Sequence, residues 1–267
     1  MPEIVKVILI AAGILGGIGA LLGAVLSLIS KVFSVEEDPR SAQITAALPG
    51  ANCGGCGYAG CSAYAQAIVS EGAPINACHS GGQPVADQIA HIMGVSAQKM
   101  ERRVAFVRCS GTADHAVEKY VYRGILDCNA AMRLQSGPKQ CAYACLGLGS
   151  CAAVCPEAAI TVSNGVASVS AALCGGCGKC ATVCPRHVID MIPETAAFTV
   201  GCSSESKGVQ TKKDCSAGCI GCRLCEKNCP EGAIAVTNNV AKIDYEKCTG
   251  CGQCAEKCPV KIIRRTV

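Results

Sequence analysis

Cysteine is the residue type in this chain whose number and spacing point to chemistry. The 267 residues include 24 cysteines but only 6 tyrosines, 3 phenylalanines and no tryptophan. Such a cysteine density is typical of a disulfide scaffold or of a metal-cluster protein, and disulfide-rich domains are usually shorter than about 80 residues. So few aromatic side chains make one large apolar core difficult to build. The composition therefore favours several small modules that hold inorganic clusters.

The first group of cysteines lies in a glycine-rich loop. Cys53, Cys56 and Cys61 are followed by Cys78, in the pattern C-x2-C-x4-C-x16-C. Glycines between them let the backbone curl around a metal centre and direct N–H groups at sulfur. Zinc sites with four cysteines usually combine two short knuckles instead of taking three ligands from one loop. The spacing predicts a [4Fe–4S] cluster, with a zinc site as the alternative.

An internal repeat occupies the C-terminal part of the chain. The shift that aligns Cys155-Pro-Glu with Cys229-Pro-Glu also superimposes most of the other cysteines in the two halves. Runs of the form C-x2-C-x2-C-x3-C-P end at Pro185, Pro230 and Pro259. In two-cluster bacterial ferredoxins, the first three cysteines of such a run ligate one cubane and the fourth ligates the other. The repeat therefore predicts two tandem two-cluster units.

The first half departs from the regular run. Leu148 stands where the second half has Cys222, and a cubane still needs four thiolates, so we expect Cys141 to supply the missing ligand. The predicted sets are Cys141, Cys145, Cys151 and Cys184; Cys155, Cys174, Cys177 and Cys180; Cys219, Cys222, Cys225 and Cys258; and Cys229, Cys248, Cys251 and Cys254.

Four cysteines remain after five [4Fe–4S] clusters have been assigned. They are Cys109, Cys128, Cys202 and Cys215. The shift of the repeat also places Cys128 on Cys202 and Cys141 on Cys215. These thiols could be structural or free in a reducing compartment, or they could ligate a further cluster, and the sequence leaves both interpretations open.

An uncharged segment near the N-terminus predicts a membrane anchor. The segment Val7–Ser30 would form a helix about 36 Å long, enough for a hydrocarbon layer of about 30 Å. A cleaved signal peptide, the alternative, usually has an apolar region of about 7–15 residues. Gly13 and Gly17, like Gly19 and Gly23, are four positions apart, which favours packing against a second membrane helix. Cluster-binding cysteines would place the following residues in a reducing cytoplasm.

The expected fold class is α+β. An N-terminal transmembrane helix is followed by a small helical [4Fe–4S] module and by two tandem ferredoxin-like 2[4Fe–4S] units with short β-hairpins. Helices are expected over 62–71 and 85–100, and hairpins over 159–169 and 234–243. The expected domains are the anchor (1–33), the N-terminal cluster module (34–100), a connector (101–127), the first two-cluster unit (128–200) and the second (201–267).

Charge and motifs exclude several function classes. The net charge of +4 is too small for a basic nucleic-acid-binding surface, and we find no nucleic-acid-binding motif. The sequence also has no dinucleotide-binding fingerprint, Walker loop or catalytic triad. Residues 205–267 carry 11 basic and 7 acidic side chains, which could steer an acidic redox carrier or be ordinary solvated charges. We expect one-electron relay, with hydride transfer and ion translocation carried out by partner subunits.

With these residues in view, the chain resembles the B subunits of Rnf complexes, membrane ferredoxin:NAD oxidoreductases that pump Na+ or H+. The resemblance rests on the membrane helix, on Val35–Pro39 and on the Asn52–Cys61 loop with Cys78. It also rests on Gly137–Cys151 and the two tandem units, which resemble the longer form of this subunit. It implies a single-pass protein of the inner membrane that accepts electrons from reduced ferredoxin and passes them to other Rnf membrane and peripheral subunits. A stand-alone membrane-anchored polyferredoxin and a structural zinc or disulfide protein are the alternatives.

Overall fold

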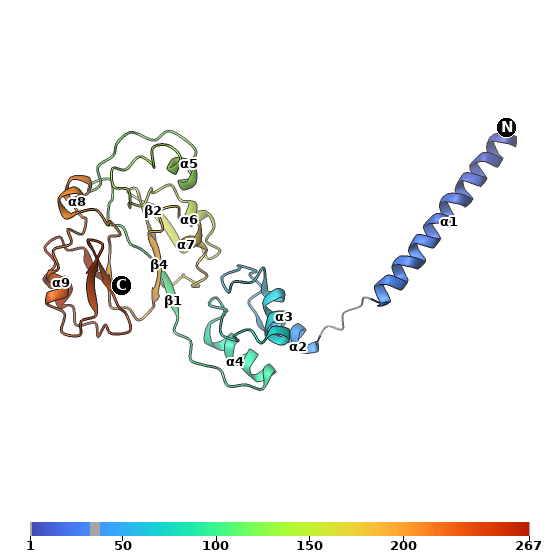
Figure 1. The fold of residues 1–267 in the computed structure, drawn as a ribbon, viewed down its shortest axis with the longest axis horizontal. Helices are drawn as coiled ribbons and strands as arrows, with labels where there is room; N and C mark the ends of the chain where they lie inside the picture. The colour runs from blue at the N-terminus through green and yellow to red at the C-terminus, as the bar shows by residue number, and fades with distance from the viewer. Residues whose placement is uncertain (1, 33–37, 267) are drawn as a thin grey trace.

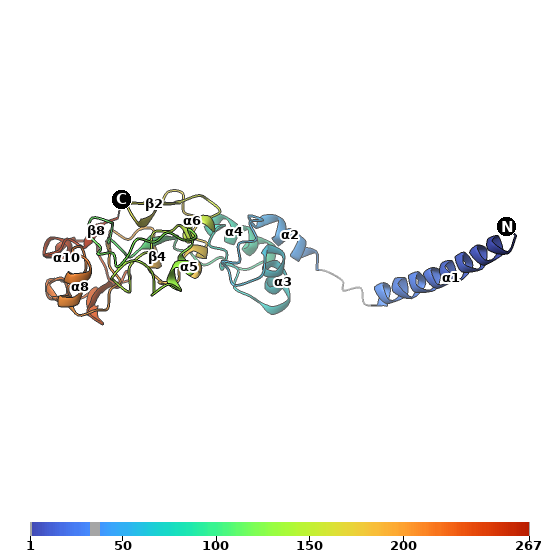
Figure 2. The ribbon, with the colours of Figure 1, turned by 90° about the horizontal axis from the view of Figure 1, so that it is seen from above.

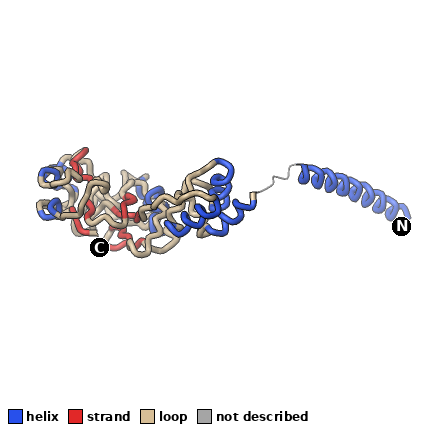
Figure 3. Tube along the Cα trace, turned by 90° about the horizontal axis from the view of Figure 1, so that it is seen from below, coloured by secondary structure: helices blue, strands red, loops and turns tan. Residues whose placement is uncertain are grey.

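The fold is a linear series of parts that contain helices and strands. The computed structural model describes residues 2–32 and 38–266, so Val35–Glu37 of the family-like motif lie outside the described residues. An N-terminal helix is followed by a small helical module and then by two units that contain strands (Figure 1). Figure 3 shows the strands gathered in these two C-terminal units.

The helix α1 (Pro2–Val32) stands apart from the other elements in Figure 2. Its segment Ile8–Leu28 is long and apolar enough to cross a membrane, and none of it is buried within the protein. Leu9, Leu15 and Leu28 each expose about 70% of their surface. A helix that is apolar on all sides needs an apolar environment, and the described residues supply none around α1. Within residues 2–32 and 38–266, one helix thus has the length and composition of a membrane span.

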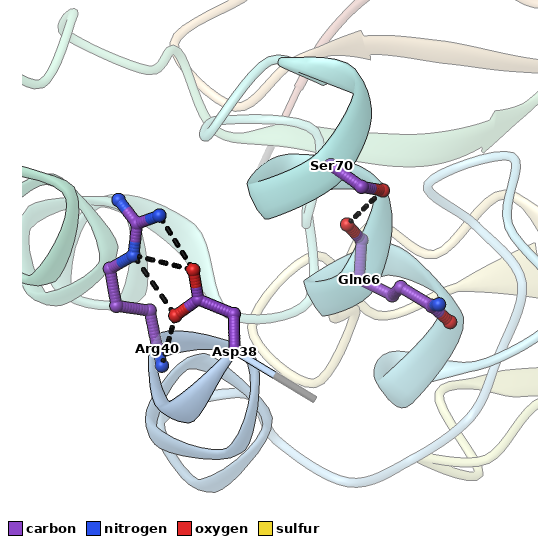
Figure 4. Close-up of polar contacts among 4 residues, drawn as sticks. All are labelled: Asp38, Arg40, Gln66 and Ser70. Carbon is purple, nitrogen blue, oxygen red and sulfur yellow. Dashed lines mark hydrogen bonds and ion pairs between the residues drawn. The ribbon is translucent and has the colours of Figure 1, made fainter. Parts of the chain in front are cut away.

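The helical module spans residues 38–100 and consists of α2 (Pro39–Ala47), α3 (Cys61–Glu71) and α4 (Gly82–Met93). Ile44, Tyr64, Ile68 and Ile89 form its buried core. Asp38 caps α2 by accepting hydrogen bonds from the backbone N–H and the guanidinium of Arg40, and Ser70 donates to the Gln66 carbonyl within α3 (Figure 4). The helix expected up to Met100 is shorter, because Gly94 takes a left-handed φ of 69° at the C-cap of α4.

The first unit, residues 101–195, contains two antiparallel strand pairs. Its elements are β1 (Arg103–Val107), α5 (Cys128–Met132), α6 (Ser150–Ala153), β2 (Ile160–Ser163), β3 (Val166–Val169), α7 (Lys179–Val183) and β4 (Ile189–Pro193). β1 pairs with β4, with Val104 opposite Ile192, and β2 pairs with β3. The segment expected as a connector therefore supplies an outer strand of this unit.

The second unit, residues 196–266, has the same arrangement. Its elements are β5 (Phe198–Val200), α8 (Gly208–Asp214), α9 (Leu224–Lys227), β6 (Ile234–Thr237), β7 (Val240–Ile243), α10 (Gln253–Glu256) and β8 (Ile263–Arg265). β5 pairs with β8 and β6 with β7. The core of each unit combines short aliphatic residues with the cysteines themselves.

Both expected hairpins are confirmed. The turns use Asn164-Gly165 and Asn238-Asn239, and all four residues have left-handed φ values between 48° and 74°. Type I′ turns need a positive φ at both central positions, which asparagine and glycine accept most readily. The hairpins place Cys155 and Cys229 at equivalent positions before β2 and β6.

We expect Tyr64→Phe to loosen the helical module. The buried Tyr64 hydroxyl donates to the Pro74 carbonyl at 2.6 Å and accepts from the Ala77 N–H at 3.0 Å. Its removal leaves both backbone groups unpaired, which costs about 1–3 kcal/mol. Native-state hydrogen exchange of α3 should show this loss. Tyr58→Phe is the matched control, because its hydroxyl has no hydrogen bond among the described residues. Equal exchange in the two variants would contradict the expectation.

Candidate iron–sulfur sites

The four cysteines of the N-terminal loop line one cavity. Cys53, Cys56, Cys61 and Cys78 surround it, with Tyr64 on one side. Asn52, at a left-handed φ of 45°, accepts a hydrogen bond from the Cys61 N–H at 2.8 Å and so holds the loop against the start of α3. All four cysteines predicted for this site are therefore brought together.

The second site lies in the first unit between the strand pairs and α7. The pKa of Cys180 is raised to about 11, mainly by burial and then by the neighbouring thiols of Cys174, Cys177 and Cys155. The Ala105 N–H of β1 donates to the Cys174 sulfur at 3.4 Å, and the Ala159 N–H donates to the Cys155 sulfur at 3.4 Å. Donors of this kind stabilise a ligating thiolate and tune its cluster.

Both sites predicted in the second unit also assemble. Burial raises the pKa of Cys225 to about 11, and the thiols of Cys219, Cys222 and Cys258 contribute in the same direction. A cavity beneath Phe198 is lined by Cys229, Cys248, Cys251 and Cys254. Cys222 and Cys251 are exposed, so each site has one ligand at the protein surface.

The irregular site of the first unit contains Cys128 in the place expected for Cys141. Cys128, Cys145, Cys151 and Cys184 line one cavity, and the pKa of Cys151 is raised to about 12 by burial and by the three other thiols. Asp127 caps α5 and accepts from the Ser150 hydroxyl at 2.7 Å, while that hydroxyl accepts from the Cys128 N–H at 2.7 Å. The grouping expected from the sequence is therefore not the one in the structure.

Cys141 lies in another cavity, together with three of the four cysteines that the sequence left unassigned. This cavity is lined by Cys109, Cys141, Cys202 and Cys215, and it lies where the two units meet. Each of the 24 cysteines thus falls into one of six groups of four.

The chemistry of these groups suits cluster ligands. No cysteine forms a disulfide. In the described part of the chain, no three His, Cys, Asp or Glu side chains converge closely enough to share one metal ion. A cubane needs a wider arrangement, because each of its four thiolates binds a different iron. The residues present therefore fit [4Fe–4S] clusters.

The N-terminal site abuts the second site. Cys177, a member of the second group, also lines the N-terminal cavity. A Cβ atom on Gly55 would lie 2.5 Å from the Cys177 carbonyl oxygen, so only glycine permits this approach. The two sites are thus neighbours in space although their loops are far apart in the sequence.

Comparison with known proteins identifies the same segments. Residues 48–80 match the family described as "Putative Fe-S cluster", residues 138–195 match the LdpA Fe-S cluster-binding domain, and residues 218–262 match the 4Fe-4S dicluster domain. The B subunit of the ion-translocating oxidoreductase complex of Methanosarcina acetivorans is 43% identical over 259 residues, which cover 97% of this chain and 98% of the relative.

The chain belongs to the family of B subunits of ion-translocating (Rnf) oxidoreductase complexes. The B subunit of the Na+-translocating ferredoxin:NAD+ oxidoreductase complex of Acetobacterium woodii is 44% identical over 96% of this chain and 77% of the relative. The Salmonella newport relative aligns over only 108 residues, 39% of this chain and 56% of the relative, at 41% identity. This Rnf protein therefore matches the longer relatives over nearly its whole length, and it is an iron–sulfur electron-transfer subunit of its complex.

We expect Cys128→Ala to remove one cluster and a second change to restore it. Leu148 packs against the buried cluster of Cys128, Ala131 and Leu146, and it occupies the repeat position of Cys222. Anaerobically purified Cys128→Ala should lose about four irons per chain, because a [4Fe–4S] cluster needs four ligands. Adding Leu148→Cys should return them. Iron and sulfide analysis checks both variants, and full iron content in Cys128→Ala would contradict the assignment.

Proposed function

We propose that this Rnf subunit accepts electrons from a reduced ferredoxin at its second unit. Its cysteines would then hold the clusters that relay them towards membrane partners, which reduce NAD+ and translocate Na+ or H+. The names of the relatives include ferredoxin, NAD+ and either Na+ or proton translocation, which supports this choice of donor, acceptor and ion. The chain would contribute the relay alone, because its sequence has no dinucleotide fingerprint.

The observation that carries the proposal is the exposure of ligands on the second unit. Cys222 and Cys251 are its exposed cysteines, whereas Cys145, Cys151, Cys174 and Cys180 of the first unit are buried. Arg223 and Lys227 flank Cys222 on the surface, and Leu224 beside them is 41% exposed. An apolar contact with two cations beside it, Lys227 and the Arg223 that also pairs with Glu226 at 3.2 Å, suits a small acidic redox carrier, which would be steered by its charge.

The other end of the series points towards the membrane. The N-terminal site abuts the first unit through Gly55 and Cys177, and its module follows α1 in the chain. We propose that α1 anchors the protein as a single membrane pass and that the cluster-bearing residues lie in the cytoplasm, where thiols stay reduced. The N-terminal site would then be the one closest to the membrane partners.

The proposed ligand sets follow the cavities. We propose that residues 101–195 and 196–266 are ferredoxin-like two-cluster units, each with strands β1 and β4 or β5 and β8 as its outer pair. Five clusters would be held by Cys53, Cys56, Cys61 and Cys78; Cys128, Cys145, Cys151 and Cys184; Cys155, Cys174, Cys177 and Cys180; Cys219, Cys222, Cys225 and Cys258; and Cys229, Cys248, Cys251 and Cys254. When bound, these clusters supply one-electron redox chemistry.

Reversing the charge beside Cys222 tests the proposed docking surface. The double variant Arg223→Glu/Lys227→Glu should be reduced by ferredoxin about tenfold more slowly at low salt, because electrostatic steering raises association rates by about 10-fold or more. Stopped-flow absorbance of the full chain measures this rate.

The matched control is Arg123→Glu/Arg133→Glu, which reverses two exposed charges on the first unit. Its rate should stay close to that of the unmodified protein, and both variants should keep their full iron content. The difference between the variants should shrink as salt rises. Equal slowing in both, or no slowing in either, would contradict ferredoxin docking at the second unit.

A further inference from the structure

We propose that Cys109, Cys141, Cys202 and Cys215 ligate a sixth [4Fe–4S] cluster, which joins the two units into one continuous relay. The inference rests on the proposed electron-transfer function. Without this cluster, the two clusters of one unit would have no connection for electron transfer to the two clusters of the other. We refer to these four residues as the bridging cysteines.

The cavity of the bridging cysteines resembles the other cluster cavities in size and lining. Its space, which opens to solvent, is about 330 Å³. The corresponding values are about 330 Å³ for the N-terminal cavity, which Cys177 also lines, and about 350 and 360 Å³ for the two other cavities lined by four cysteines. Cys141, Cys202 and Cys215 are buried, and Cys109 is half-buried. An apolar pocket that holds four thiols and the same volume as its neighbours suits the same occupant.

The two units contribute to the cavity in the same way. Cys109 lies two positions after the end of β1, and Cys202 lies two positions after the end of β5. Cys141 and Cys215 each precede the first cysteine of a run by four positions. Each unit therefore supplies one cysteine after its first strand and one before its run, so the site follows the pseudo-symmetry of the repeat.

Backbone N–H groups are already directed at all four sulfurs. The N–H of Gly111 donates to Cys109 at 3.4 Å and that of Ser204 donates to Cys202 at 3.4 Å. Tyr143 and Ala217 provide backbone hydrogen bonds to Cys141 and Cys215. In every case the donor lies two positions after the cysteine. Such a donor favours the thiolate, which is the form that binds metal.

A buried cation lies beside the bridging cysteines. Lys139 is only 2% exposed, and its ammonium donates to the carbonyls of Gly111 and Gly165 at 2.6 and 2.7 Å. Among the described residues, no carboxylate lies within ion-pair distance of it. A buried charge without an ionic partner is costly. A cubane held by four thiolates is anionic, and it would supply the missing negative charge.

The bridging site contacts a ligand of each unit. The N–H of Cys145 donates to the Cys109 sulfur at 3.3 Å, and the N–H of Cys219 donates to the Cys202 sulfur. Cys145 and Cys219 are equivalent in the repeat and belong to the irregular site and to the Cys222 site. One electron at a time would pass between these two sites through the bridging position, with no bond formed or broken and no proton taken up.

Backbone pairing fixes the two units around this position. The Val117 N–H donates to the Asp214 carbonyl at 2.9 Å, and the Ser216 N–H donates to the His115 carbonyl at 2.9 Å. Arg108, which also lines the cavity, forms an ion pair with Asp190 at 3.0 Å. The bridging cysteines are thus held in place by main-chain contacts on both sides of Cys215.

Iron counting on the full chain, purified anaerobically in detergent, tests the proposal. The unmodified protein should contain about 24 irons for six cubanes, against about 20 for five. Cys215→Ala should lose about four irons or convert one cluster to a three-iron form with a new EPR signal in the oxidised protein. Cys109→Ala/Cys215→Ala should lose no more than about four, because both residues serve one cluster, whereas Cys215→Ala/Cys222→Ala should lose about eight.

The rate at which ferredoxin reduces each cluster shows whether the sixth cluster transfers electrons between the units or only binds metal. In Cys215→Ala, ferredoxin should rapidly reduce only the two clusters of the second unit, and dithionite should reduce the rest. Three results would overturn the sixth cluster while leaving the other five. They are about 20 irons in the unmodified protein, an iron content and EPR spectrum of Cys215→Ala that do not change, and zinc bound at this site. Rapid reduction of every remaining cluster would overturn the bridge. An unmodified chain without iron would instead contradict the proposed function itself.

Discussion

Thiolate ligation is the interaction on which the rest of this structure depends. The two strand-containing units bury few large side chains, and their cores consist of short aliphatic residues packed around cysteines. Burial raises the pKa of Cys151 to about 12 and that of Cys202 to about 11, so these groups would remain neutral thiols without a metal. Iron bound by these cysteines would replace their protons and would supply free energy that the small cores lack.

The architecture follows from a repeat whose two halves differ in length. The second unit keeps the regular run, including Cys222, whereas the first unit has Leu148 at that position. The segment between Cys109 and Cys141 is longer than the one between their counterparts Cys202 and Cys215. The extra residues in the first unit include α5, which begins with Cys128. These extra residues thus carry the cysteine that lines the cavity of the irregular site.

The sequence predicted the elements and the groups of cysteines that local spacing determines. The hairpins follow from asparagine-containing turns, and each regular run groups its first three cysteines, because neighbouring cysteines in a short loop can reach one cluster. Cys128 could not be placed in this way, because its partner Ser150 and its neighbour Leu148 are distant in sequence. The sequence also did not indicate that Cys109 and Cys202 are equivalent, because the shift of the repeat does not place one on the other. The pairing of β1 with β4 joins segments that are far apart in the chain, so no short sequence pattern predicts it.

This arrangement also explains why the chain can be long without a large core. Each group of four cysteines organises its own surroundings, and neighbouring groups touch through single contacts such as Gly55 with Cys177. A relay built in this way grows in length while its members stay adjacent.

Hydrogen exchange before and after iron removal tests most directly whether ligation maintains the fold. The account predicts that the backbone N–H groups of β2, β3, β6 and β7 are protected in the anaerobic holoprotein and lose that protection when iron is chelated under reducing conditions. Equal protection in the iron-free chain would contradict it, because the aliphatic cores alone would then be sufficient to hold the two units together.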